Sequence, residues 1–117
     1  MARYIKLLPG DRASTNDVSM PDASTFEIPC RSNESDIIVI DATRWLEGAT
    51  INTATETTGF MSIVVASPLV TVTVTGNDAD QSGDIDITDS TGRSRLVTIA
   101  TRSPLATVAD GYPIWSW

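Results

Sequence analysis

The stretch of sequence that decides the fold is Val70-Thr71-Val72-Thr73-Val74-Thr75. Valine and threonine alternate, so an extended chain places all the valines on one face and all the threonines on the other. This is the pattern of a strand that buries one face and exposes the other, as strands of antiparallel sheets do. β-Branched side chains also pack well on a pleated surface. The sequence therefore predicts a half-buried antiparallel strand here.

Similar short segments occur on both sides of this strand. Each is a run or an alternation of apolar residues bounded by glycine, proline or polar turn residues. These segments are residues 26–28, 36–41, 49–55, 60–66, 85–88 and 96–101. Short strands with a turn signal about every ten residues are typical of a sandwich or a barrel. Only residues 41–48 could form a helix, of a single turn. We therefore expect an all-β protein, an antiparallel β-sandwich.

The 117 residues suffice for a single core, which we place in a β-sandwich domain at residues 25–103. Residues 1–24 show no sustained period and contain the turn signals Pro9-Gly10-Asp11 and Pro21-Asp22. We predict an extended N-terminal arm there, and a disordered tail is the alternative. Residues 104–117 are predicted to form an aromatic C-terminal tail.

Apolar residues near the two ends of the chain are the candidate contacts with a partner. Exposed tryptophan is costly in water, so the C-terminal tail is expected either to fold back onto the domain or to dock on another protein. The candidate partner-binding residues are Tyr4, Ile5, Leu7 and Leu8 in the arm and Tyr112, Ile114, Trp115 and Trp117 in the tail.

The composition argues against several function classes. The formal net charge of −7 disfavours binding to nucleic acid and to anionic membranes. The chain has no histidine, which excludes Ser–His–Asp and Cys–His catalysis and removes the commonest transition-metal ligand. Cys30 is the only cysteine, so no intrachain disulfide can form. We therefore expect no enzymatic activity and no cofactor.

An acidic segment after the Val/Thr strand resembles a calcium loop. Oxygen-bearing side chains alternate along it and a glycine permits a sharp turn, as in EF-hand loops. The candidate ligands are Asp78, Asp80, Ser82, Asp84 and Asp89. Two features depart from the pattern: Asp89 stands where a glutamate normally binds with both oxygens, and no helix-forming sequence follows. Two alternatives stay open, a polar hairpin loop and a Ca²⁺ site.

The run from Asp41 to Ile51 carries a resemblance to a known family. Its pattern, Asp41-x-x-x-Trp45-Leu46-x-Gly48-x-Thr50-Ile51, resembles the start of an immunoglobulin-like β domain in structural proteins of tailed bacteriophages. The Val/Thr strand and the hairpin Ser90-Thr91-Gly92-Arg93 match later parts of that family's pattern. The resemblance covers residues 36–102. The chain departs from the family in an aspartate-rich turn after the valine strand and in a long N-terminal segment. The simplest physical interpretation of Trp45 is a plug at one end of the core.

This resemblance implies an immunoglobulin-like sandwich in a non-enzymatic virion protein, assembled in the host bacterial cytoplasm. Members of the family are tail-fibre or head–tail adaptor proteins. The implied partners are other virion proteins, such as capsid, portal or neck, tail and fibre subunits, together with further copies of the chain. Two alternatives remain: a capsid decoration protein that stabilises the phage head, and a carbohydrate-binding β-sandwich.

Overall fold

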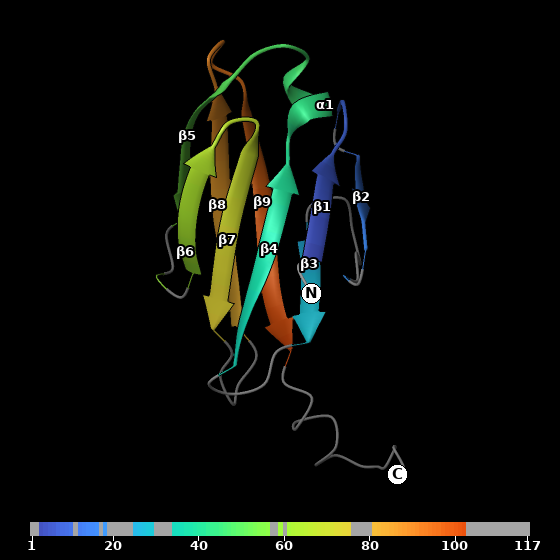
Figure 1. Cartoon of the computed structure of the whole chain (residues 1–117), viewed down its shortest axis with the longest axis vertical. Helices are drawn as coiled ribbons and strands as arrows, with labels where there is room; N and C mark the ends of the chain where they lie inside the picture. Colours follow the sequence, from blue (N-terminus) through green and yellow to red (C-terminus); the bar gives the residue numbers. More distant parts are fainter. Residues whose placement is uncertain are drawn as a thin grey trace.

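The computed structural model describes residues 3–10, 12–16, 18, 25–29, 34–56, 59, 61–75 and 81–102. In these ranges the chain forms two β-sheets packed face to face and a single short helix (Figure 1). The expected all-β sandwich is therefore confirmed.

The larger sheet has five strands in the order β2-β1-β4-β7-β6. Its strands are β1 (Arg3–Leu7), β2 (Ala13–Thr15), β4 (Ser35–Asp41), β6 (Met61–Ala66) and β7 (Leu69–Thr75). The smaller sheet has four strands in the order β3-β9-β8-β5. Its strands are β3 (Thr25–Pro29), β5 (Ile51–Glu56), β8 (Gln81–Asp89) and β9 (Ser94–Arg102).

The Val/Thr alternation of β7 has the predicted effect. Val70, Val72 and Val74 are fully buried, and the threonines between them point to the outer face of the larger sheet. Isoleucines at alternate positions of β8 meet these valines from the other sheet, since Ile85 and Ile87 are also fully buried. The core is thus filled from the inner faces of both sheets, as in other aligned sandwiches.

A single helical turn closes one end of the sandwich. Helix α1 (Thr43–Leu46) follows β4 directly and buries Trp45 and Leu46 in the core. Positive φ angles of 53° at Glu47 and 94° at Gly48 end it after one turn. The predicted core plug at Trp45 is confirmed, because only 5% of this residue is exposed.

The N-terminal residues differ from the predicted arm. Residues 3–7 form β1, which pairs with β4 inside the larger sheet, and Ile5 and Leu7 are fully buried. The prediction missed this strand because it has only five residues and turn signals follow it at once. Burying two large aliphatic side chains stabilises the fold by roughly 3–6 kcal/mol relative to leaving them exposed. The arm prediction is therefore wrong for residues 3–7 and 13–15, which form β1 and β2.

Both sheets are mixed rather than purely antiparallel. β1 runs parallel to β4, and β3 runs parallel to β9, whereas all other strand pairs are antiparallel. Parallel neighbours cannot be joined by a tight hairpin, so these pairs bring together segments far apart in the sequence. The alternation of apolar residues along a strand does not indicate whether the strand runs parallel or antiparallel to its neighbour. The sequence therefore did not reveal these pairs.

Arg95 connects the N-terminal hairpin to the opposite sheet. Its guanidinium donates hydrogen bonds to the backbone oxygens of Leu8, Gly10 and Arg12, at 3.4, 2.8 and 3.1 Å. The residue is 6% exposed although it carries a charge. The carbonyls of the β1–β2 turn therefore provide partners for a nearly buried cation, and the turn is held against β9.

Candidate interaction surface

The outer face of the larger sheet carries an apolar band across its middle. The strand register defines its central row: Tyr4 of β1 pairs with Val39 of β4, Val39 with Thr71 of β7, and Thr71 with Val64 of β6. Directly paired residues point to the same face of a sheet, so these four side chains lie in one line on the solvent side.

Apolar residues on either side widen this row. Ile37 lies two residues before Val39 on β4, and Leu69 lies two residues before Thr71 on β7, so both share the outer face. We use the name apolar band for Tyr4, Ile37, Val39, Val64 and Leu69. The exposed fractions are 47% for Tyr4, 48% for Ile37, 64% for Val64 and 37% for Leu69. Contiguous exposed apolar side chains of this kind mark interaction sites.

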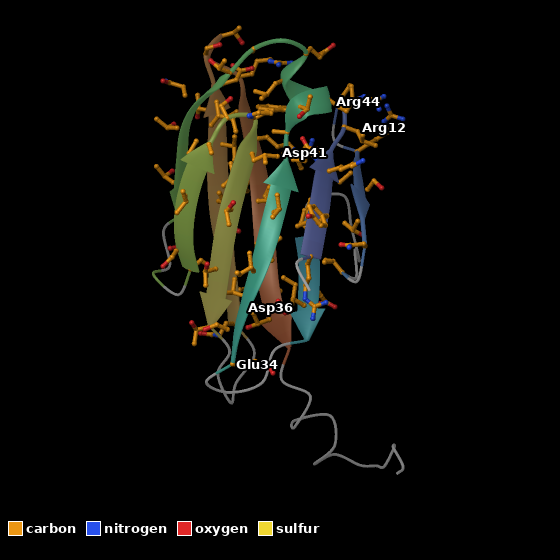
Figure 2. The ribbon with its side chains drawn as sticks, viewed as in Figure 1. Arg12, Glu34, Asp36, Asp41 and Arg44 are labelled. Carbon is orange, nitrogen blue, oxygen red and sulfur yellow. The ribbon has the colours of Figure 1, made fainter. Side chains whose placement is uncertain are left out.

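Charged residues lie toward the ends of the larger sheet rather than in its middle. Figure 2 shows Glu34 and Asp36 at the start of β4, and Asp41, Arg12 and Arg44 around its other end. Asp36 accepts a 2.7 Å hydrogen bond from Arg3 Nε in a partly buried ion pair. Both residues of this pair lie on the inner side of the sheet, since Arg3 pairs with the buried Ile38 and Asp36 alternates with it. On the outer face, Lys6 of β1 pairs with Asp41 of β4, so charged groups border the apolar band at this end.

The Asp41 carboxylate is held in place by hydrogen bonds from Thr43. Its Oδ1 accepts hydrogen bonds from the Thr43 hydroxyl at 2.6 Å and the Thr43 amide at 3.0 Å. These bonds, together with the positive charge of Lys6 on the neighbouring strand, hold the pKa of Asp41 below its ordinary value against the opposing effect of burial. The carboxylate is thus charged at neutral pH at the point where α1 begins.

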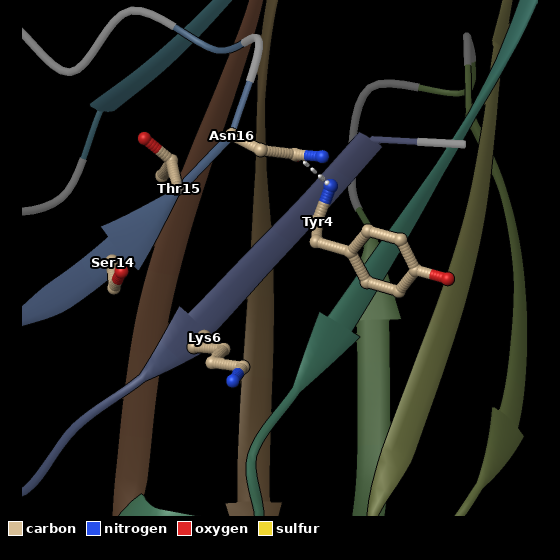
Figure 3. A pocket seen from close by; sticks show the side chains of 5 residues that line it. All are labelled: Tyr4, Lys6, Ser14, Thr15 and Asn16. Carbon is tan, nitrogen blue, oxygen red and sulfur yellow. Dashed lines mark hydrogen bonds between the residues drawn. The ribbon is translucent and has the colours of Figure 1, made fainter. Parts of the chain in front are cut away.

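A shallow hollow of about 270 Å³ adjoins the band at Tyr4. It is lined by Tyr4, Lys6, Ser14, Thr15 and Asn16 (Figure 3). The backbone N–H of Tyr4 donates to the side-chain oxygen Oδ1 of Asn16 at 2.6 Å. The backbone N–H of Asn16 in turn donates to the backbone carbonyl of Tyr4 at 3.3 Å. These two bonds close the end of the β1–β2 hairpin and fix the Asn16 side chain at the rim. The lining combines an aromatic ring, an amine, hydroxyls and an amide.

The outer face of the smaller sheet is different in character. Asp84 accepts a 2.7 Å hydrogen bond from Thr98, and the hydroxyls of Thr88 and Ser94 lie 3.4 Å apart. Among the described residues of this sheet, Leu96 is the one exposed large apolar side chain, with 49% of its surface accessible. A polar face of this kind is hydrated at little cost, so the two outer faces of the sandwich offer partners different chemistry.

The sequence-predicted partner residues fall into three groups. Tyr4 is exposed and belongs to the apolar band, and Leu8 is partly exposed after β1. Ile5 and Leu7 point into the core and are not available to a partner. The third group, Tyr112, Ile114, Trp115 and Trp117, lies outside the described residues.

Sequence reasoning missed the remaining members of the apolar band. Ile37 and Val39 lie in the apolar run Ile37-Ile38-Val39-Ile40, and Val64 lies in Ile63-Val64-Val65. In a strand buried on one face only, alternate residues should be polar. Unbroken apolar runs in a sheet of this kind were therefore the available signal that its outer face carries apolar residues.

The proposed calcium ligands do not converge. Ser82, Asp84 and Asp89 lie along β8, and Asp84 and Asp89 are five positions apart, about 17 Å in an extended strand. Ligands of one Ca²⁺ ion all lie within about 2.6 Å of it. The carboxylate of Asp89 also accepts hydrogen bonds from Thr91 and Arg93. These three residues therefore cannot share an ion, and Asp78 and Asp80 lie outside the described residues.

The described residues form neither a metal site nor a membrane-spanning helix. Among the described residues, no three acidic or cysteine side chains come together as a metal site would require. No helix within these ranges has the length and apolar character needed to cross a membrane. No family model matches the sequence, and no curated protein matches it either. The apolar band and the adjoining hollow are therefore the features from which a function can be argued.

Proposed function

We propose that this protein is a non-enzymatic structural component of a tailed-bacteriophage particle, an adaptor in the neck or tail region that connects head or tail to fibres. The observation that carries the proposal is the apolar band. A single β-sandwich that leaves Tyr4, Ile37 and Val64 exposed on the same outer face has a surface suited to being covered by another protein. Assembly by surface complementarity needs no catalytic group.

The strand order supports the immunoglobulin-like part of this proposal. In that arrangement one sheet contains strands B, E and D in this order and the other contains C, F and G. Here β4, β7 and β6 correspond to the first set, and β5, β8 and β9 to the second. The sandwich departs from this arrangement in β3, which adds a strand to the second set and pairs in parallel with β9. It also departs in β1, which runs parallel to β4, and in the added strand β2. The additions β1 and β2 create the Tyr4 side of the band.

The sequence pattern around Trp45 supports the phage assignment. Trp45, Leu46 and Gly48 carry the resemblance, and they form the turn that closes the core. Residues that are needed to pack one end of the core do not specify which partner the outer surface binds. The choice between adaptor and capsid decoration protein therefore depends on the number of copies in a particle.

Carbohydrate binding is a second candidate, favoured by the hollow beside Tyr4. Residues that line the hollow include an aromatic, a basic and several hydroxyl or amide residues, which are types that can contact a sugar. This function would use Tyr4, Lys6 and Asn16 and would leave Ile37 and Leu69 without a role. A glycan-array screen that gives no binding would remove this candidate.

The adaptor proposal is tested by counting copies of the protein in purified particles by quantitative mass spectrometry. We expect a low count consistent with rings at the neck or tail. Absence from particles would overturn the virion assignment, and a count near that of the major capsid protein would overturn the adaptor role in favour of decoration.

A charge placed in the band tests whether this surface mediates incorporation. Ile37→Lys places an ammonium group within the apolar band, next to Val39, without touching the core, and we expect it to abolish incorporation into particles. Leu96→Lys is the matched control, since Leu96 is equally exposed on the opposite outer face. Equal incorporation of both variants, each folded by circular dichroism, would contradict a role for the band.

A further inference from the structure

Edge strands expose unpaired backbone groups, and proteins usually block them with short strands, charges, prolines or bulges. Three of the four sheet edges in the described chain carry such features. β2 has only three residues. β3 carries Glu27 and ends at Pro29. β5 has a register irregularity between Ile51 and Thr53 and ends at Glu56.

The fourth edge, β6, carries none of these features. Its six residues, Met61-Ser62-Ile63-Val64-Val65-Ala66, include no charge, proline or glycine, and all six pair in continuous register with β7. Among the described residues no strand hydrogen-bonds to its other side, although β5 of the smaller sheet lies near β6. Regular backbone geometry and an uncharged sequence make this edge a template for a further strand.

Two apolar side chains of β6 are also largely exposed to solvent in the single chain. Val64, on the outer face, is 64% exposed. Val65 points toward the inner face, like its partner Val70, yet it is still 41% exposed because the sheet ends there. A strand added beside β6 would cover Val65 and continue the core past the present edge.

We propose that β6 pairs in an antiparallel manner with β6 of a second copy of this chain, so that the two larger sheets join across a two-fold axis. Directly opposed residues must point to the same face, which allows only registers centred on a residue. A register centred on Val64 places Val64 opposite Val64 of the second copy. It also places Ile63 opposite Val65 on the inner side, where Val65 needs cover.

The chemistry of the strand itself, and not the charge of the whole chain, favours a second copy as the occupant. The chain has a formal net charge of −7, so two copies repel each other at most orientations. At β6 they meet without any charged side chain on the pairing strands. An isologous contact also presents the same uncharged, β-branched strand from both sides, which matches its chemistry to itself. This proposal does not rest on the phage assignment.

The oligomeric state in solution tests the proposal. Light scattering coupled to size-exclusion chromatography should give twice the monomer mass for the full chain at tens of micromolar. Val64→Lys should shift the protein to monomer mass, because two ammonium groups would face each other directly. Val64→Thr keeps a β-branched residue without charge and should remain a dimer, as should Leu96→Lys. A monomeric wild-type protein, or a dimeric Val64→Lys variant, would overturn the proposal.

Disulfide trapping tests the register. In a Cys30→Ala background, Val64→Cys should form a covalent dimer under mild oxidation, since directly opposed positions on antiparallel strands lie within disulfide reach. Ser62→Cys is the control: in the same register its two copies are roughly 13 Å apart and should not crosslink. Crosslinking of Ser62→Cys without crosslinking of Val64→Cys would overturn the proposed pairing.

Ile37→Lys separates this proposal from the proposed function. It alters the apolar band but leaves β6 unchanged, so a dimer that no longer enters particles would support both proposals. A monomeric Ile37→Lys variant would contradict the assignment of the dimer contact to the β6 edge. Wild-type protein that is dimeric but absent from particles would overturn the function and leave the β6 contact supported.

Discussion

Asp89 and Arg93 are joined across the β8–β9 turn by a 2.7 Å hydrogen bond from Arg93 Nε to Asp89 Oδ2. The other carboxylate oxygen of Asp89 accepts from the amides of Thr91 and Arg93, both at 2.9 Å, and from the Thr91 hydroxyl at 2.7 Å. Gly92, with φ of 94°, permits this tight turn. A fully buried carboxylate is thus satisfied entirely by its own hairpin.

Arg93 extends this arrangement to the helical turn. Its guanidinium lies 5.0 Å from the centre of the Trp45 ring and donates to the carbonyl oxygens of Trp45 and Leu46 at 3.1 and 3.2 Å. A weaker contact of 3.3 Å reaches Glu47. The hydrogen bonds to Asp89 raise the pKa of Arg93, so the cation persists at any pH of interest. Asp89, Arg93 and Trp45 therefore hold α1 against the β8–β9 hairpin.

Acid should weaken the fold through Asp89. Burial alone would raise its pKa, but the hydrogen bonds from Thr91 and Arg93 outweigh burial and hold the pKa well below the ordinary 3.8. A depressed folded-state pKa contributes stability above the unfolded-state pKa, and this is lost as pH falls toward the folded-state value. We expect the free energy of unfolding, measured in urea, to decrease from about pH 5 to pH 2.

Asp89→Asn should flatten this pH dependence and lower stability at pH 7. Asp41→Asn serves for comparison: the pKa of Asp41 is also lowered, but its bonds come from Thr43 alone. The flattening should therefore be smaller for Asp41→Asn. An Asp89→Asn variant with the same slope as wild type between pH 5 and pH 2 would contradict the assigned role.

Trp45→Ala should destabilise the protein by about 3–5 kcal/mol, the usual cost of removing a large aromatic side chain from a core. The residue is 5% exposed and also supports the Arg93 guanidinium. Leu96→Ala, at an exposed position, should change stability by no more than about 0.5 kcal/mol. Chemical denaturation of both variants provides the measurement. Similar values for the two would show that Trp45 does not close the core.

The N-terminal strand should be required for folding. Ile5→Ala is expected to cost about 2–5 kcal/mol, because the side chain is fully buried. Tyr4→Ala, one residue earlier on the exposed face, should cost less than about 1 kcal/mol. Deletion of residues 1–16 should lower the melting temperature steeply, since it removes β1 and β2. A truncated protein that melts like the full chain would restore the interpretation of this segment as an arm.

Arg95→Met should loosen the β1–β2 turn. The substitution keeps the apolar stem but leaves the carbonyls of Leu8, Gly10 and Arg12 without the guanidinium. A loss of about 1–3 kcal/mol is expected for polar groups deprived of a charged partner. Amide hydrogen exchange should accelerate in residues 8–16 more than in β7 of the same variant. Uniform acceleration across the chain would argue against a local role.

The sequence by itself determined the all-β class, the positions of most strands after residue 25 and the burial of Trp45. These are local properties: the alternation of Val70 to Thr75 assigns the two faces of a strand without knowledge of its neighbours. The Thr91-Gly92 turn likewise requires a positive φ that glycine supplies.

Only the tertiary structure decided how distant segments meet. The parallel pairing of β1 with β4 makes a core strand of a segment with a weak pattern of its own, and it brings Tyr4 beside Val39 in the apolar band. The same pairing order leaves β6 at an edge, where apolar residues that would be covered in a central strand stay exposed. Periodicity records which side of a strand is apolar, but strand order decides what lies against it.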